Sequence, residues 1–111
     1  MSLVTTHVLD TAKGIPAPGI PVLLDAHRTG DTGGWSLVAE GRTDDDGRVR
    51  DLGPEQLDAG VYRLTFDTAA YLGEDTFFPE VAITFRITDP AAHHHVPVLL
   101  SPFSYSTYRG S

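Results

Sequence analysis

Short stretches of alternating apolar and polar residues, separated by turns rich in glycine and proline, run through almost the whole chain. The clearest is 81–87, where Val81, Ile83, Phe85 and Ile87 alternate with small or polar side chains. Successive side chains of a β-strand point to opposite faces, so this pattern predicts a strand with one buried face. Long amphipathic helices are not indicated anywhere, which argues against repeated strand-helix-strand units.

The same pattern predicts about eight short strands. They cover 1–10, 20–27, 35–43, 48–52, 61–67, 81–87, 93–101 and a short segment after Pro102-Phe103. Turns are predicted over 11–19, over 28–34 and at Asp44-Asp45-Asp46-Gly47, where aspartates precede a glycine. A single helical turn is predicted over 53–60 and a short helix within 68–78. The expected fold is an all-β sandwich with one short helix.

Composition narrows the possible functions. A chain of 111 residues has room for one domain, over residues 1–111, with a modest core. Its net charge of −7 argues against a nucleic-acid or anionic-membrane surface, because phosphate binding needs clustered Lys and Arg. Cysteine is absent, which excludes disulfides, thiolate metal sites and a cysteine nucleophile. Residues 1–6 show no signal-peptide pattern, so a cytoplasmic protein that binds a small molecule or a protein is expected.

The last nineteen residues concentrate the reactive side chains. Val96, Val98 and Leu100 share one parity, whereas His93 and His95 share the other. A strand here would bury its apolar face and present two imidazoles on the opposite face. Histidine titrates near neutral pH and is both the commonest general base and the commonest metal ligand, so this face is a candidate site.

The chain ends in Tyr108-Arg109-Gly110-Ser111, which combines an aromatic ring, a fixed cation, a flexible joint and a hydroxyl with the terminal carboxylate. On composition alone, a frayed polar tail is the ordinary interpretation of such a terminus.

Two further residues are candidates because of their position. His7 lies in the middle of the first predicted strand, and leucines accompany the histidines on both strand faces. Such faces indicate a sheet surface that another subunit covers. Arg48 follows the predicted hairpin turn, from which its guanidinium can point into a site built by neighbouring strands.

Other kinds of site fit the sequence less well. A zinc site would need His93 and His95 plus a third ligand, such as His7 or His27, and the paired spacing of structural zinc sites is absent. No metal is therefore expected. A serine hydrolase is disfavoured because the Gly-x-Ser-x-Gly elbow is missing. The three aspartates of the hairpin lack the spacing and the downstream glutamate of a calcium loop, so a solvated turn is the better interpretation.

Several segments together match one family, essentially from end to end. They are His7-Val8-Leu9-Asp10, Gly14-Ile15-Pro16-Ala17, Thr43-Asp44-Asp45-Asp46-Gly47-Arg48, Phe77-Phe78-Pro79-Glu80, His95-Val96-Pro97 with Leu99-Leu100-Ser101, and Tyr105-Ser106-Thr107-Tyr108-Arg109-Gly110-Ser111. By these segments the sequence closely resembles the 5-hydroxyisourate hydrolases, the transthyretin-related enzymes of urate breakdown. Transthyretin, a hormone carrier of the same fold, lacks the Tyr-Arg-Gly-Ser ending and the catalytic histidines. One departure is His94, where the family commonly has tyrosine.

The resemblance implies a transthyretin-like eight-stranded sandwich assembled as a homotetramer, a dimer of dimers, with sites in the channel between dimers. It implies no cofactor. The implied reaction is hydrolysis of the cyclic amide of 5-hydroxyisourate to 2-oxo-4-hydroxy-4-carboxy-5-ureidoimidazoline, by histidine-assisted attack of water without metal. The implied catalytic residues are His7, Arg48 and His95. The implied substrate-binding residues are His7, Arg48, Tyr108, Arg109 and Ser111.

Two other functions stay open at this point. One is a non-catalytic small-ligand carrier on a transthyretin-like tetramer. The other is a metal-binding accessory domain of a larger assembly.

Overall fold

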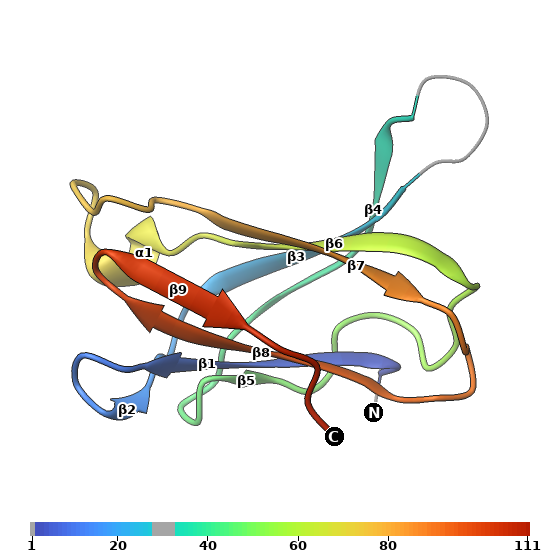
Figure 1. Ribbon diagram of the computed structural model, residues 1–111, viewed down its shortest axis with the longest axis horizontal. Coiled ribbons are helices and arrows are strands. Elements are labelled where there is room, and N and C mark those ends of the chain that lie inside the picture. Colours follow the sequence, from blue (N-terminus) through green and yellow to red (C-terminus); the bar gives the residue numbers. More distant parts are fainter. Residues whose placement is uncertain (1, 28–32) are drawn as a thin grey trace.

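The computed structural model describes residues 2–27 and 33–111 as two facing β-sheets (Figure 1). The first sheet has the strand order β2-β1-β8-β9, with β5 also paired to β1, and the second has the order β4-β3-β6-β7. The strands of the first sheet are β1 (Val4–Asp10), β2 (Ile15–Pro16), β5 (Arg48–Val49), β8 (His94–Ser101) and β9 (Ser104–Thr107). Those of the second are β3 (Pro21–His27), β4 (Trp35–Arg42), β6 (Gly60–Phe66) and β7 (Val81–Ile87). A short helix, α1 (Ala69–Leu72), lies between β6 and β7 in the chain.

The all-β sandwich with one short helix is thus confirmed, and each of the eight predicted strands has a counterpart. The two-residue β2 is additional, because it forms inside a segment predicted to be a turn. The predicted turn over 28–34 lies largely outside the described residues, as does Met1. Among the described helices, none is long and apolar enough to cross a membrane.

The helical turn predicted over 53–60 is wrong. These residues are irregular up to Gly60, where β6 begins. The backbone in this region bonds to the N-terminal segment instead of to itself. The carbonyl of Pro54 accepts from the N–H of Leu3 at 3.1 Å, and the N–H of Leu52 donates to Oγ of Ser2 at 2.8 Å. Since each backbone group needs one partner, these tertiary bonds replace the local ones.

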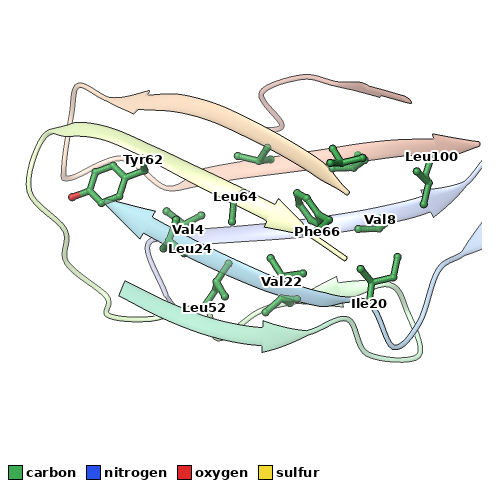
Figure 2. Close-up of a cluster of buried hydrophobic side chains, with 14 of the residues drawn as sticks. Val4, Val8, Ile20, Val22, Leu24, Leu52, Tyr62, Leu64, Phe66 and Leu100 are labelled. Atoms are coloured by element: carbon green, nitrogen blue, oxygen red, sulfur yellow. The ribbon is translucent and has the colours of Figure 1, made fainter. Parts of the chain in front are cut away.

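The apolar faces of the two sheets meet in one core, as Figure 2 shows. The alternation predicted for β6 is confirmed, with Tyr62, Leu64 and Phe66 buried. In β7, Val81 and Ile87 are buried, but Ile83 and Phe85 are only partly covered. The reason is that β7 is the edge strand of its sheet, so the middle of its apolar face lies at the margin of the core.

Strand β1 positions the candidate site, because it pairs with three other strands. It runs parallel to β8, with Thr5 opposite His95, and antiparallel to β5, with His7 opposite Arg48. The hydroxyl of Thr6 on the inner face donates to the carbonyl of Val96 at 2.6 Å. Residues from the start, the middle and the end of the chain therefore lie together on the outer face of this sheet, around β1.

The predicted hairpin turn before Arg48 is confirmed. The N–H of Gly47 donates to the carbonyl of Asp44 at 2.9 Å, and Oδ1 of Asp44 accepts from the N–H of Arg48 at 3.0 Å. Gly47 has a φ of 74°, and a Cβ there would collide with the carbonyl oxygen of Val8. Only glycine fits such a conformation and such an approach, so this turn fixes where Arg48 begins.

Helix α1 is tied to the end of β1 by one hydrogen bond. The hydroxyl of Tyr71 donates to Oδ2 of Asp10 at 2.7 Å, and the N–H of Lys13 donates to Oδ1 at 3.0 Å. Burial alone would raise the pKa of Asp10, but these hydrogen bonds lower it on balance. Burial, together with the hydrogen bond to Asp10, raises the pKa of Tyr71 to about 12.

Replacing Tyr71 with Phe is expected to lower the free energy of unfolding by about 1.5–3 kcal/mol at neutral pH, since a buried carboxylate loses a donor. Urea denaturation measures this loss. The tyrosine ionises near pH 10 when unfolded and near 12 when folded, so the wild-type advantage should shrink as the pH rises between these values. Tyr62→Phe is the control, because its hydroxyl donates to the neutral carbonyl of Asp58. Equal losses in both variants would contradict the prediction.

Candidate active site

His95 lies on the outer face of the first sheet, as the alternation in β8 predicts. Val96, Val98 and Leu100 are buried on the opposite face. The imidazole of His95 is partly covered, and its Nδ1 lies 2.8 Å from Oγ1 of Thr5. Because the threonine occupies Nδ1, Nε2 is the ring nitrogen left for a water molecule or a substrate.

His93 shares this threonine. Its Nε2 lies 2.9 Å from Oγ1 of Thr5, and its ring stands nearly parallel to that of His95, with 6.5 Å between the centroids. The side chain of Thr5 is buried, whereas His93 is exposed. One buried hydroxyl therefore joins an exposed imidazole to a partly covered one.

His7 lies on β1 itself, and Arg48 lies on β5, which pairs with the edge of β1 opposite to β8. They face each other in the register of β1 and β5. The Nε2 atom of His7 is buried and has no hydrogen-bond partner among the described residues. Buried polar atoms are nearly always paired, so an unpaired ring nitrogen beside a guanidinium marks a place for a polar ligand atom or water.

The pKa values of His7 and His95 are both lowered from 6.5. Burial is the largest cause for each, followed by the positive charge of Arg48. For His95, the neighbouring His7 and His93 lower the pKa further. Both rings are thus mainly neutral at physiological pH, which is the form that accepts a proton.

Apart from His7, the groups described above line one pocket of about 230 Å³. Its walls are Thr5, Thr6, Arg48, Arg50, His93, His95 and Ser111. Of the predicted site residues, the structure brings Arg48, His95 and Ser111 into this pocket, and places His7 beside it on β1. Thr5, Thr6 and Arg50 were not predicted from the sequence, and His93 was placed on the candidate face beside His95 but was given no catalytic or substrate-binding role. The signal for Thr5 was its spacing of two from His7, which puts both on one strand face.

The C-terminal tail folds back over the start of β8 (Figure 1). The N–H of Gly110 donates to the carbonyl of His95 at 2.8 Å. A Cβ on Gly110 would lie 2.6 Å from Cδ2 of His95 and 3.2 Å from Cγ of Pro97. Its φ is not in the left-handed region. Glycine is required here because the imidazole leaves no space for a side chain, rather than because the tail needs a flexible joint.

Tyr108 and Arg109, the other two side chains of the tail, do not line the pocket that contains Arg48. In the single chain they line a second cavity of about 230 Å³, between the start of β8 and the edge strand β7. Phe85 and Arg86 form part of its wall. His95 borders both cavities, and the tail contributes Tyr108 and Arg109 to one and Ser111 to the other.

Within residues 2–27 and 33–111, no group of three or more His, Cys, Asp or Glu side chains is arranged to hold a metal ion. The pocket wall offers the neutral imidazole of His95, with that of His7 beside it, together with guanidinium groups and the hydroxyl groups of Thr5 and Ser111. This set can activate water and stabilise negative charge on an oxygen.

Comparison with known proteins shows the family to which the chain is related. The model of the HIUase/Transthyretin family matches residues 4–110. The chain belongs to this family. The HIUase/Transthyretin match covers every residue of the pocket except Ser111.

Named relatives agree with this assignment. The chain is 44% identical to the 5-hydroxyisourate hydrolase of Salmonella typhimurium over 114 residues, which is 99% of this chain and 82% of the relative. It matches the solved 5-hydroxyisourate hydrolase of Klebsiella pneumoniae with a TM-score of 0.82 and 35% identity, covering 97% of this chain and 98% of that one. Sea bream transthyretin in complex with thyroxine gives a TM-score of 0.86 and 35% identity, with 96% and 93% covered.

Proposed function

We propose that this protein is a 5-hydroxyisourate hydrolase, which opens the cyclic amide of its substrate with water to give 2-oxo-4-hydroxy-4-carboxy-5-ureidoimidazoline. The observation that carries the proposal is the pocket where His95, Arg48 and Ser111 meet, next to His7, in a chain 44% identical to enzymes of that name. It would act as a single domain over residues 1–111. A cytoplasmic location stays a prediction.

The water would be activated by His95. Its Nδ1 is held by Thr5, which leaves Nε2 of a neutral ring to take a proton as water attacks the amide carbonyl. General-base assistance of this kind contributes about 10²–10⁴-fold. The unpaired Nε2 of His7 would hold the same water or the substrate from the opposite side.

The arginines would bind the ring and stabilise the developing oxyanion. Arg48 lines the pocket, and its planar, permanently charged fork suits two oxygen atoms of an imide. A well-placed oxyanion donor is worth about 10²–10³-fold. Tyr108, Arg109 and Ser111 would contribute substrate contacts from the tail, with Ser111 already in the pocket of its own chain.

A homotetramer, a dimer of dimers, would complete the site. The exposed aromatic side chains support this, since Phe77 is 65% and Phe103 79% exposed. Large exposed apolar groups commonly mark surfaces that another subunit covers. A pocket of about 230 Å³ is also small and open for a purine-derived ring, and neighbouring subunits would enclose it.

Following the ultraviolet absorbance of 5-hydroxyisourate tests the function directly. The substrate decays spontaneously, so the uncatalysed rate must be subtracted. Turnover proportional to enzyme concentration, unchanged by chelator, is the expected result. Saturable binding without turnover would favour the carrier function instead, for which sea bream transthyretin with thyroxine is the precedent.

The lowered pKa values of His7 and His95 predict the pH dependence. Because the base must be neutral, kcat/KM should be constant above neutral pH and should fall only as the pH drops below 6.5. Rates between pH 5 and 8 measure this fall in kcat/KM, the acid limb of the profile.

In Arg48→Gln, the loss of a nearby positive charge should move the acid limb to higher pH, toward the ordinary pKa of histidine. Arg48→Lys keeps the charge, so its limb should stay in place while kcat/KM falls with the lost fork. If kcat/KM fell at the same pH in the wild type, in Arg48→Gln and in Arg48→Lys, the assignment of His7 and His95 as the bases would be contradicted.

A further inference from the structure

The hydroxyl of Thr5 lies between two ring nitrogens and has one hydrogen. It is 2.8 Å from Nδ1 of His95 and 2.9 Å from Nε2 of His93. A hydroxyl can donate to one of these nitrogens and accept from the other, but it cannot donate to both. The ring hydrogens of the two imidazoles are therefore coupled through one atom.

The coupling decides whether His95 is a base. If Thr5 donates to His95, the ring hydrogen of His95 moves to Nε2, and the nitrogen facing the pocket has no lone pair. If Thr5 donates to His93 instead, His95 keeps its hydrogen on Nδ1, and its Nε2 can accept a proton from water. A catalytically competent His95 thus requires His93 to be the acceptor of the threonine hydrogen.

The reaction itself leaves a proton to be removed. Hydrolysis breaks one C–N bond and forms one C–O bond, so an amide and water give a carboxylic acid and an N–H group. One hydrogen of the water goes to the leaving nitrogen. The other is released, because a carboxylic acid ionises well below neutral pH. The base takes the first hydrogen as water attacks, and it stays positively charged until that charge leaves the covered site.

The charges around His95 favour such a transfer. Burial and the positive charge of Arg48, which lines the same pocket, both lower the pKa of His95. Arg50 also lines the pocket but is paired with the carboxylates of Asp44 and Asp46. A protonated His95 is therefore disfavoured by burial and by Arg48, whereas His93 is exposed to solvent. Moving the proton from the first ring to the second takes it out of the pocket.

We infer that His93 and Thr5 are positioning and proton-transfer residues for His95. In this relay, the Nδ1 hydrogen of a protonated His95 passes to Oγ1 of Thr5, as the hydroxyl hydrogen of Thr5 passes to Nε2 of His93. The exposed His93 then releases a proton to the solvent. No bond other than N–H and O–H changes. The transfer leaves the remaining hydrogen of His95 on Nε2, from which it goes to the leaving nitrogen of the substrate. The reverse transfer, in which His93 takes a proton from solvent and Thr5 returns a hydrogen to Nδ1 of His95, then restores the base and the hydrogen bond from Thr5 to His93. The inference rests on the proposed hydrolysis, because that reaction supplies the proton.

Kinetics in weak buffer test the relay. We expect kcat to fall about 10²-fold in Thr5→Val and in His93→Gln, the low end for a positioned acid–base group, with KM little changed. Thr5→Ser keeps the hydroxyl and should retain the wild-type kcat. Added imidazole should restore His93→Gln but not Thr5→Val. His27→Gln removes a histidine on β3 of the other sheet and should behave as wild type. Circular dichroism and thermal unfolding verify that each variant is folded.

The ring tautomers can be measured without substrate, from the ¹⁵N chemical shifts of the imidazoles. In the wild type we expect His95 protonated at Nδ1 only and His93 unprotonated at Nε2. In Thr5→Val both rings should become mixtures of tautomers. A wild-type His95 protonated at Nε2, or identical spectra in the valine variant, would overturn the inference.

The two proposals fail in different ways. If the wild type hydrolyses 5-hydroxyisourate and both Thr5→Val and His93→Gln match it in weak buffer, the relay is wrong and the function stands. If the wild type does not hydrolyse it, the proposed function is wrong, and with it the need for the relay as a proton exit.

Discussion

His95→Asn is expected to lower kcat/KM by about 10²–10⁴-fold, the contribution of a positioned general base. Asparagine is similar in size to the inner part of the imidazole and can still bond to Thr5, but it offers no titratable nitrogen to the pocket. The loss should therefore appear mainly in kcat, because the shape of the pocket is largely kept. Initial rates of 5-hydroxyisourate loss, corrected for spontaneous decay, measure it.

His27→Asn is the matched control for removing one imidazole, because His27 lies on β3 and not on the pocket wall. We expect its rate to equal that of the wild type. A His95→Asn enzyme within twofold of the wild type would rule out this ring as the base. In that case His7, with its unpaired Nε2, would be the remaining candidate.

Deleting residues 108–111 is expected to reduce hydrolysis to the uncatalysed background. The deletion removes Arg109, Ser111 and the hydrogen bond from Gly110 to His95, and with them part of the lining of both cavities. Strand β9 ends at Thr107, so the sandwich should remain folded. Circular dichroism and thermal unfolding check the fold, and full turnover by the shortened chain would exclude the tail from the mechanism.

Gly110→Ala separates the packing of the tail from its functional groups, because it keeps Arg109 and Ser111. The added methyl would meet the His95 ring at 2.6 Å, so either the ring or the tail must move. A displacement of about 1 Å in a catalytic group can cost about 10²-fold, which is the loss we expect in kcat. Thermal unfolding checks that the variant keeps the stability of the wild type, so that a loss of kcat reports on the contact with the ring. Wild-type kcat in Gly110→Ala would show that contact with the ring does not matter.

The fold could be predicted largely from local patterns. Alternation in β6, β7 and β8 reports which side of each strand is buried, and the side-chain period of two makes that signal unambiguous. The Asp-rich hairpin was equally clear, because a glycine with positive φ is needed there. The segment 53–60 was mispredicted since its bonds go to the N-terminal segment, a partner that no local pattern reveals.

The candidate site was only partly predictable. Chemical type singled out His7, His95 and Arg48, and the family resemblance added the tail. The resemblance did not distinguish Ser111 from Tyr108 and Arg109. Ser111 lines the pocket that contains Arg48, whereas Tyr108 and Arg109 line the neighbouring cavity. The spacing of Thr5 places it on the same strand face as His7, but a threonine in a strand is ordinary, so its residue type did not mark it as functional.

By itself, the sequence determined which faces are buried and which side chains have the chemistry to activate water, because periodicity and residue type are local properties. Only the tertiary structure decided which of these side chains meet. The parallel pairing of β1 with β8 joins Thr5 to His93 and His95 across about ninety residues, and the fold of the tail decides that position 110 has no room for a side chain. Both depend on the register of strands far apart in the chain, which is set by packing of the whole core and not by any single segment.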